Sequence, residues 1–277
     1  MEFFDTHAHL NFSDYAIDFN EIIENSLKTG ISIINVGTNL LSSERAVDLA
    51  QAYEAGVFAA IGLHPSNIQY DPETQKGSSN KPEDVVEIDF DAESYGGLAD
   101  QKKVVAVGEV GLDYFRLPKS KTRTQAMKEK QRQIFLKQLA FARAKKLPVI
   151  IHCRNAHDEM IELLKNDFSD NGAVAGVIHC FTATKDQAQK YYNLGFYFGL
   201  NGILFKIDLA EAVAAMPLDR ILLETDCPFL APPGAPDRNV PQNLPTIAER
   251  VAQIRNDSVD TIINSAANNA RKLFGIN

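Results

Sequence analysis

The sequence predicts an α/β fold, namely a (β/α)8 TIM barrel, and three observations favour it. Eight apolar, β-rich runs alternate with amphipathic helical stretches, which is typical of a parallel sheet whose strands are joined by helices. The length is common for one barrel of this kind, so we expect a single domain over residues 1–277. An open doubly wound sheet would usually carry a glycine-rich turn after its first strand, whereas residues 5–9 contain no glycine.

The expected strands are the eight apolar runs, and they span residues 3–7, 32–37, 57–63, 104–109, 149–153, 174–179, 195–200 and 220–224. Helical periodicity between them predicts helices over residues 17–29, 42–53, 124–146, 157–165, 186–193 and 208–215. Ser42 is expected to cap the second of these helices. Two more helices, over residues 243–255 and 259–273, follow the last strand and should pack outside the barrel.

One connection is longer than the others and covers residues 66–103. It holds a turn-rich stretch at 76–82 and an acidic run at 83–93. We expect a surface excursion that is partly disordered. A lid over the site is the less favoured alternative, because loops that follow strands lie on the catalytic side of such barrels.

Composition and charge narrow the function classes. Hydrophobic content of 45% and charged content of 23% are ordinary for a globular protein, and no apolar run approaches the ~20 residues that span a bilayer. Three cysteines and the lack of a signal-like start predict reduced thiols in the cytoplasm, or in the nucleus of a eukaryote. The net charge of −8 does not indicate a nucleic-acid coat, so phosphate contacts must come from local positive charge or from metals. Neither a membrane nor an obligate protein partner is expected.

Polar residues gather where strands end. His7 and His9 are two residues apart on a strand and therefore point to the same side. The other candidate metal ligands lie at the ends of later strands and are Glu109, His152, His179 and Asp226. In a closed parallel barrel all these ends face one mouth, so the six side chains should surround one cavity.

Four histidines and two carboxylates at the end of an apolar core predict bound metal. An unpaired buried polar group costs a few kcal/mol, whereas a whole domain is stable by only ~5–15 kcal/mol. Six ligands exceed what one tetrahedral zinc takes, so two divalent ions bridged by one carboxylate fit better, and Glu109 is the bridge by position. The mixed ligand set suits Zn²⁺, Mn²⁺ or Co²⁺, with Mg²⁺, which prefers oxygen, as an alternative.

Several residues near the strand ends suit an anionic substrate. His64 and Arg154 end strands, and Lys206 follows the seventh strand. Glu224 shares strand parity with Asp226, so it either contacts substrate or supports a ligand from one layer below. The basic stretch 119–132 borders the mouth, but we favour a solvated helix start for its lysines.

The cysteines are not expected to bind metal. Cys153 and Cys180 each directly follow a candidate ligand, so on a strand they should point to the opposite side, into the helix layer. The direction of Cys227, beyond the last strand, stays open.

Taken in order, these motifs resemble the TatD family of metal-dependent deoxyribonucleases, within the amidohydrolase-like barrels. The motifs that carry the resemblance are Asp5-Thr6-His7-Ala8-His9-Leu10, Gly62-Leu63-His64-Pro65, Gly108-Glu109-Val110-Gly111-Leu112-Asp113-Tyr114, Ile151-His152-Cys153-Arg154, His179-Cys180-Phe181 and Glu224-Thr225-Asp226-Cys227-Pro228. The resemblance implies one metal held by His7, His9, Glu109 and Asp226, and a second held by Glu109, His152 and His179. It also implies a phosphate contact for His64. The chain departs from the family in its long acidic excursion and in Val240, which stands where an acidic residue is common.

The leading hypothesis is therefore metal-assisted hydrolysis of DNA, with single strands or DNA ends as substrate and an exonuclease-type reaction. Asp226 and Glu109 are the expected catalytic residues, and Asp226 orients the metal-activated water and takes its proton. One alternative is another hydrolase of the amidohydrolase type, such as an aminoacyl-tRNA deacylase. The other is a nucleic-acid-binding barrel without catalysis.

Overall fold

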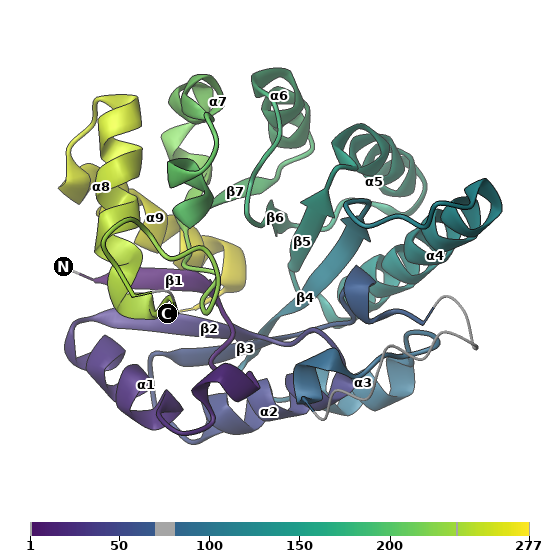
Figure 1. Cartoon of the computed structure of the whole chain (residues 1–277), viewed down its shortest axis with the longest axis horizontal. Coiled ribbons are helices and arrows are strands. Elements are labelled where there is room, and N and C mark those ends of the chain that lie inside the picture. Colours follow the sequence, from purple (N-terminus) through teal and green to yellow (C-terminus); the bar gives the residue numbers. More distant parts are fainter. Residues whose placement is uncertain (1, 70–80, 237, 277) are drawn as a thin grey trace.

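A computed structural model describes residues 2–69, 81–236 and 238–276. In this part of the chain, eight strands form one sheet, in which each strand pairs in parallel with the next along the sequence (Figure 1). The strands are β1 (Phe3–Ala8), β2 (Ile31–Val36), β3 (Val57–Ile61), β4 (Val104–Asp113), β5 (Val149–Arg154), β6 (Gly176–Ile178), β7 (Tyr197–Leu200) and β8 (Ile221–Leu223). All eight predicted strands are present, with ends shifted by a few residues.

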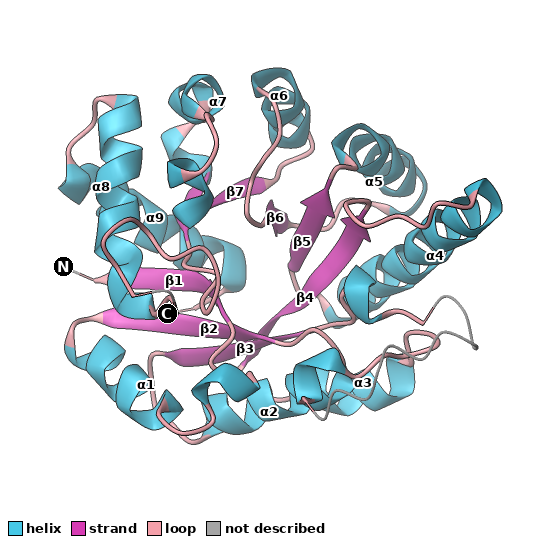
Figure 2. Ribbon diagram, in the orientation of Figure 1, coloured by secondary structure: helices cyan, strands magenta, loops and turns pink. Residues whose placement is uncertain are grey.

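Helices surround the sheet on its outer side (Figure 2). They are α1 (Phe19–Lys28), α2 (Leu40–Gln51), α3 (Ala92–Ala99), α4 (Lys121–Lys145), α5 (His157–Asn171), α6 (Lys185–Asn193), α7 (Ala210–Ala215), α8 (Leu244–Arg255) and α9 (Val259–Phe274). Short 3-10 turns occupy several connections. Among the described residues, none of these helices has both the length and the apolar character that crossing a membrane requires.

The seam between β8 and β1 is joined just beyond the end of β8. The backbone N–H of Asp226 donates to the carbonyl of His7 at 2.9 Å, and that of His9 donates to Cys227 at 2.9 Å. These two bonds continue the parallel pairing around the barrel, so the predicted TIM barrel is confirmed.

The barrel interior is apolar at the amino-terminal end of its strands. Phe4, Ile34, Ile150 and Leu222 belong to one buried cluster there, and Phe274 at the end of α9 joins it. The two helices that follow the last strand lie outside the barrel as predicted: α9 packs on β8 and β1, and α8 packs on α7 and α9. Polar groups are thereby left to the opposite end of the strands.

The start of α2 differs from the prediction that Ser42 is its cap. Asn39 is the cap, because its side chain accepts a hydrogen bond from the backbone N–H of Ser42 at 2.8 Å. The Ser42 hydroxyl accepts the N–H of Asn39 in return, at 3.0 Å. Ser42 is thus the reciprocal partner in a capping box, one turn inside the helix.

The long connection after β3 is more ordered than expected over its described residues. It contains the unpredicted helix α3, on which Tyr95 is buried against Glu87 with a hydroxyl-to-carboxylate distance of 3.1 Å. Glu83 accepts hydrogen bonds from Ser13, so the excursion is fixed to the loop after β1. Residues 76–80 of the predicted turn-rich stretch lie outside the described residues.

Candidate metal centre

Six predicted ligand residues meet at the carboxyl ends of the strands, and they are His7, His9, Glu109, His152, His179 and Asp226. The Nε2 atoms of His7 and His9 lie 3.1 Å apart. Oε2 of Glu109 lies 3.5 Å from Nε2 of His7 and 3.8 Å from Nε2 of His9. Oδ1 of Asp226 lies 3.9 Å and 3.6 Å from the same two nitrogens. These four side chains enclose one point.

The second oxygen of Glu109 faces three other imidazoles, those of His152, His64 and His179. Its Oε1 lies 2.7 Å from Nδ1 of His152 and 3.7 Å from Nε2 of His179. Nε2 of His179 is also 3.8 Å from Oδ1 of Asp226. Glu109 therefore stands between two groups of nitrogen atoms and presents one oxygen to each.

Irregularities in the backbone aim these side chains at the mouth. The pairing of β1 with β2 shifts between Asp5 and Ala8, and that of β4 with β5 shifts between Val107 and Val110. Each shift lies beside a ligand, and such bulges re-aim side chains at the rims of barrels. Asp226 takes a left-handed backbone conformation with φ of 56°, which turns it towards the cavity after β8 has ended.

In His9 and in His152, a neighbouring oxygen fixes the proton on one ring nitrogen. The carbonyl oxygen of Val36 lies 2.8 Å from Nδ1 of His9. Because a carbonyl can only accept, Nδ1 of His9 carries the proton and Nε2 keeps its lone pair. In His152 the other nitrogen is fixed: Oδ2 of Asp113 lies 3.1 Å from Nε2, so Nε2 carries the proton and Nδ1 faces Glu109. Asp113 was not predicted as a site residue, although it lies on β4 at the same strand parity as Glu109.

Glu224 lies behind His179 rather than in the open cavity. It is fully buried, and its Oε1 is 2.9 Å from Nδ1 of His179. The same oxygen accepts the N–H of Cys180 at 2.8 Å and the amide of Asn201 at 3.0 Å. Of the two roles expected for Glu224, support of a ligand fits this position, and direct contact with substrate does not.

Burial and charge keep His7 neutral and the two acidic ligands ionised. Burial, together with the nearby His179, lowers the pKa of His7 to about 4. Burial would raise the pKa values of Glu109 and Asp226, but the surrounding imidazoles outweigh it and lower both. Neutral imidazoles and ionised carboxylates are the forms that bind metal ions.

His152 and His179 behave differently, because each lies between carboxylates. Burial works against protonation of His152, but Asp113 and Glu109 outweigh it and raise its pKa to about 9. Glu224, Asp226 and Glu109 likewise overcome burial and raise the pKa of His179 to about 10. In the metal-free protein these two rings are therefore protonated on both nitrogens at neutral pH. A cation that binds to either ring would displace one of its two protons.

The donor set fits divalent cations. Ligand atoms that share one ion at about 2.0–2.2 Å are held about 3–4 Å apart, and this is the spacing among His7, His9, Glu109 and Asp226. Nδ1 of His7 is buried without a hydrogen-bond partner among the described residues, so no protein group fixes its proton.

His64 borders this cluster as a hydrogen-bond donor. Its Nδ1 accepts the backbone N–H of Ser66 at 3.0 Å, so the neutral ring carries its proton on Nε2. That Nε2 lies 3.4 Å from Oε1 of Glu109, and burial lowers the pKa of the ring. A neutral imidazole with an N–H facing the cavity can donate to an anionic substrate.

The other two predicted substrate contacts lie further out. Arg154 is exposed, and its guanidinium carbon is 3.6 Å from the centroid of the Phe115 ring. Lys206 is exposed directly after the 3-10 turn Gly202–Phe205, and within the described part of the chain it forms no ion pair with the six ligands. Their contact with substrate stays a prediction.

The prediction that Cys180 points into the helix layer is wrong. Strand β6 ends at Ile178, and Cys180 has a left-handed φ of 44°, so strand alternation no longer applies there. Its sulfur lies within 4.8 Å of ligand atoms of His179 and Asp226. Burial and the acidic neighbours raise the pKa of this thiol well above its ordinary value, which makes it a poor ligand.

The other two thiols lie away from the cavity. Cys153 is buried beside Tyr191 of α6, in the helix layer as predicted. Cys227 is fully buried, and burial raises the pKa of its thiol to about 12.

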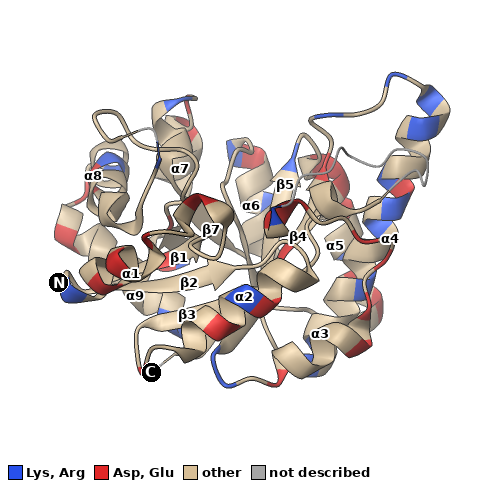
Figure 3. Ribbon diagram, turned by 60° about the horizontal axis from the view of Figure 1, so that its bottom comes forward, with Lys and Arg blue, Asp and Glu red and all other residues tan. Residues whose placement is uncertain are grey.

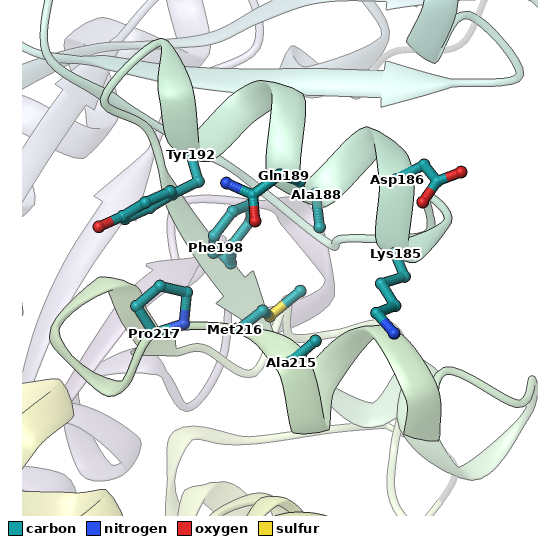
Figure 4. Close-up of a pocket in the computed structure, with 9 residues that line it drawn as sticks. All are labelled: Lys185, Asp186, Ala188, Gln189, Tyr192, Phe198, Ala215, Met216 and Pro217. Atoms are coloured by element: carbon teal, nitrogen blue, oxygen red, sulfur yellow. The ribbon is translucent and has the colours of Figure 1, made fainter.

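A separate pocket of about 170 Å³ lies on the outer side of the barrel between α6 and the end of α7 (Figure 4). Its lining includes Tyr192, Phe198 and Met216, and none of the six ligand residues takes part. It is therefore distinct from the metal centre.

Comparison with known proteins agrees with this geometry. The family model described as TatD related DNase matches residues 4–275. The chain is 34% identical to the uncharacterized metal-dependent hydrolase YabD of Bacillus subtilis over 282 residues, which covers 99% of each chain. It is also 34% identical to the 3'-5' ssDNA/RNA exonuclease TatD of Erwinia amylovora over 284 residues, covering 99% of this chain and 100% of that one.

Solved structures show the same relationship. The crystal structure of YjjV, a TatD homolog from Escherichia coli, superposes with a TM-score of 0.80 at 28% identity, covering 99% of this chain and 98% of that one. A TatD family hydrolase from Entamoeba histolytica shares the fold with a TM-score of 0.81 at 23% identity, over 100% of this chain and 99% of its own. The chain therefore belongs to the TatD-related DNase family of metal-dependent hydrolases.

Proposed function

We propose that this protein hydrolyses phosphodiester bonds at an end of single-stranded DNA and that it works with two divalent cations. The observation that carries the proposal is the position of Glu109, whose two oxygens face separate groups of nitrogen atoms. The first cation would be held by His7, His9, Glu109 and Asp226, and the second by Glu109, His152 and His179. The relative named 3'-5' ssDNA/RNA exonuclease supports this choice of substrate.

Such a pair of cations, when bound, supplies a water of lowered pKa and neutralises charge on a phosphate. Asp226 has the more open carboxylate of the two acidic ligands, with 13% of its side chain exposed against 6% for Glu109. It is ionised, and it borders the cavity from which water arrives. Asp226 therefore orients the attacking water and accepts its proton.

His64 and Arg154 supply hydrogen-bond donors on the substrate side, the first from a neutral ring and the second from a cation. The Nε2–H of His64 donates to a non-bridging phosphate oxygen, where charge increases as the bond to phosphorus forms. Arg154 stands further out on β5, two residues beyond His152, and its guanidinium attracts the next phosphate along the strand. Both contacts position the strand end against Glu109 and Asp226.

Cleavage of end-labelled single-stranded and duplex DNA by metal-reconstituted protein tests this function. Asp226→Asn should lower turnover by at least about 100-fold, because a proton acceptor of this kind contributes roughly 10²–10⁴-fold. Asp48→Asn, an exposed substitution on α2, is the matched control and should leave turnover unchanged.

Two results would overturn the proposal. Hydrolysis of aminoacyl-tRNA without cleavage of DNA would assign the same centre to ester hydrolysis of another kind. Binding of DNA by the metal-loaded protein with no turnover would show a barrel that binds nucleic acid without catalysis.

A further inference from the structure

The exposed large hydrophobic side chains among the described residues share one location. Each lies in a segment that follows a strand or in the first turn of the next helix, and the set is Ile17, Leu41, Val85, Ile88, Phe115, Ile207 and Phe229. In a parallel barrel these segments surround the mouth at the carboxyl ends of the strands. Phe115 and Phe229 are the two aromatic members of this set.

Phe229 stands beside the first group of ligands. Its ring is 52% exposed, and its centroid lies 6.3 Å from the centroid of His9 at a steep angle of 70°. The turn that carries it is fixed, because the side-chain amide of Asn239 donates to the carbonyls of Phe229 at 2.8 Å and Thr225 at 2.9 Å. An aromatic face is thus held open next to the cavity.

Phe115 stands on the other side, beside the second group. Its backbone N–H donates to Asp113 at 2.9 Å, and the other oxygen of Asp113 contacts His152 at 3.1 Å. The ring is 50% exposed, and Arg154 lies over it with 3.6 Å between the guanidinium carbon and the ring centroid. Arg154 and Phe115 form a stacked pair at the rim.

Positive charge is concentrated next to this pair. Residues 115–123 contain four cationic side chains and no acidic one, in a chain with a net charge of −8. Figure 3 shows Lys and Arg on the loop that leads into α4. Open aromatic faces together with local positive charge are what proteins use to bind unpaired nucleic acid strands.

We infer that Phe229 and the Arg154–Phe115 pair stack on nucleobases on the two sides of the scissile phosphate. This inference rests on the proposed nuclease function and adds the residues that select single strands. In a duplex both faces of an internal base are already stacked, so only an unpaired strand can offer its bases to both positions. The bases are held by their faces, which makes the contacts tolerant of sequence.

The chain contains no tryptophan, so Phe229→Trp and Phe115→Trp each create a single fluorescent reporter. With metal-reconstituted protein, a phosphorothioate oligonucleotide that resists hydrolysis should quench either reporter, and an abasic oligonucleotide of equal length should not. Phe58→Trp is the control, because Phe58 lies at the amino-terminal end of β3 against Phe4, and its emission should not change. Equal quenching by both oligonucleotides, or by neither, would overturn the inference.

A kinetic measurement separates this inference from the proposed function. Stacking contributes roughly 5- to 150-fold per base, so kcat/KM should be higher by about that factor for a strand with terminal bases than for one with abasic ends. Phe229→Leu and Phe115→Leu should each lower that ratio, and the double variant should bring it close to one. Tyr replacements should restore it, and Phe58→Leu should not alter it. Base-dependent quenching without cleavage of any strand would refute the proposed function alone. Cleavage with an unaltered ratio in both leucine variants would refute the stacking alone.

Discussion

Asp5 and Thr225, although 220 residues apart, are joined by two hydrogen bonds at the seam of the barrel. Oδ2 of Asp5 accepts the hydroxyl of Thr225 at 2.6 Å, and Oδ1 accepts its backbone N–H at 2.9 Å. Asp5 is two residues before His7 on β1, and Thr225 directly precedes Asp226. The pair therefore sets the spacing between ligands that come from the two ends of the chain.

We predict that Asp5→Ala destabilises the protein and loosens the metal centre. The change leaves the buried N–H and hydroxyl of Thr225 without an acceptor, which costs about 1–3 kcal/mol. Urea unfolding should show a loss of that size, together with weaker metal retention. Asp5→Asn keeps an acceptor and should lose less. An Asp5→Ala protein as stable as the parent would show that the seam does not depend on this pair.

Gly199→Ala should mimic the loss of Glu224. A Cβ atom at position 199 would lie 2.2 Å from Oε2 of Glu224, and the buried carboxylate has no space to move. Displacing it removes the partner of Nδ1 of His179, and such changes cost about 10- to 100-fold in metal affinity. Metal titration should show this loss for Gly199→Ala and for Glu224→Gln. Gly195→Ala is not a suitable control, because φ of 89° would strain an alanine there. Gly96→Ala on α3, with open space around it, should bind metal normally.

Metal binding should release protons at neutral pH. With pKa values of about 9 for His152 and about 10 for His179, both rings are protonated at pH 7 before metal arrives. Up to two protons should leave, so apparent affinity should rise up to about 100-fold per pH unit between pH 6 and 8. Calorimetry in buffers of different ionisation enthalpy measures the number of protons released on metal binding. Asp113→Asn, which lowers the pKa of His152, should reduce the number of released protons by about one. Binding without proton release would contradict these protonation states.

Acid should destabilise the fold partly through His157. This ring contacts Tyr191 and Thr182, and burial lowers its pKa from 6.5 to about 4. The unfolded chain therefore binds the proton more readily, so stability present above pH 6.5 is lost as the pH falls towards 4. The loss is at most about 3 kcal/mol at 1.36 kcal/mol per pKa unit. Urea unfolding at pH 7 and 5 should show a smaller pH dependence for His157→Gln, and equal slopes would remove His157 from the acid response.

The barrel and the meeting of its ligands could be predicted from the sequence because two patterns agree. Apolar runs mark the strands, and a polar side chain such as His64 or His152 stands at or just beyond the carboxyl end of most of them. Once the strands are parallel and closed, topology alone brings those ends together. The distances between these side chains and the protonation of their rings depend on packing, and the sequence does not give them.

The features that were missed depend on local backbone geometry or on contacts between distant segments. Cys180 left the expected side because β6 is short and the backbone turns into the left-handed region. Helix α3 carries Gly96 and Gly97, which lower its helical propensity, and it is stabilised by burial of Tyr95. Asn239 has no motif of its own, and its role is visible only through its bonds to Thr225 and Phe229.

The count of divalent ions on each side of Glu109 tests the central claim most directly. Anomalous diffraction from crystals grown with Mn²⁺ or Zn²⁺ should show two peaks, one beside His7 and His9 and one beside His152 and His179. Glu109→Gln should weaken both peaks, because its oxygens serve both groups. A single peak, or two peaks of which neither contacts Glu109, would contradict the account.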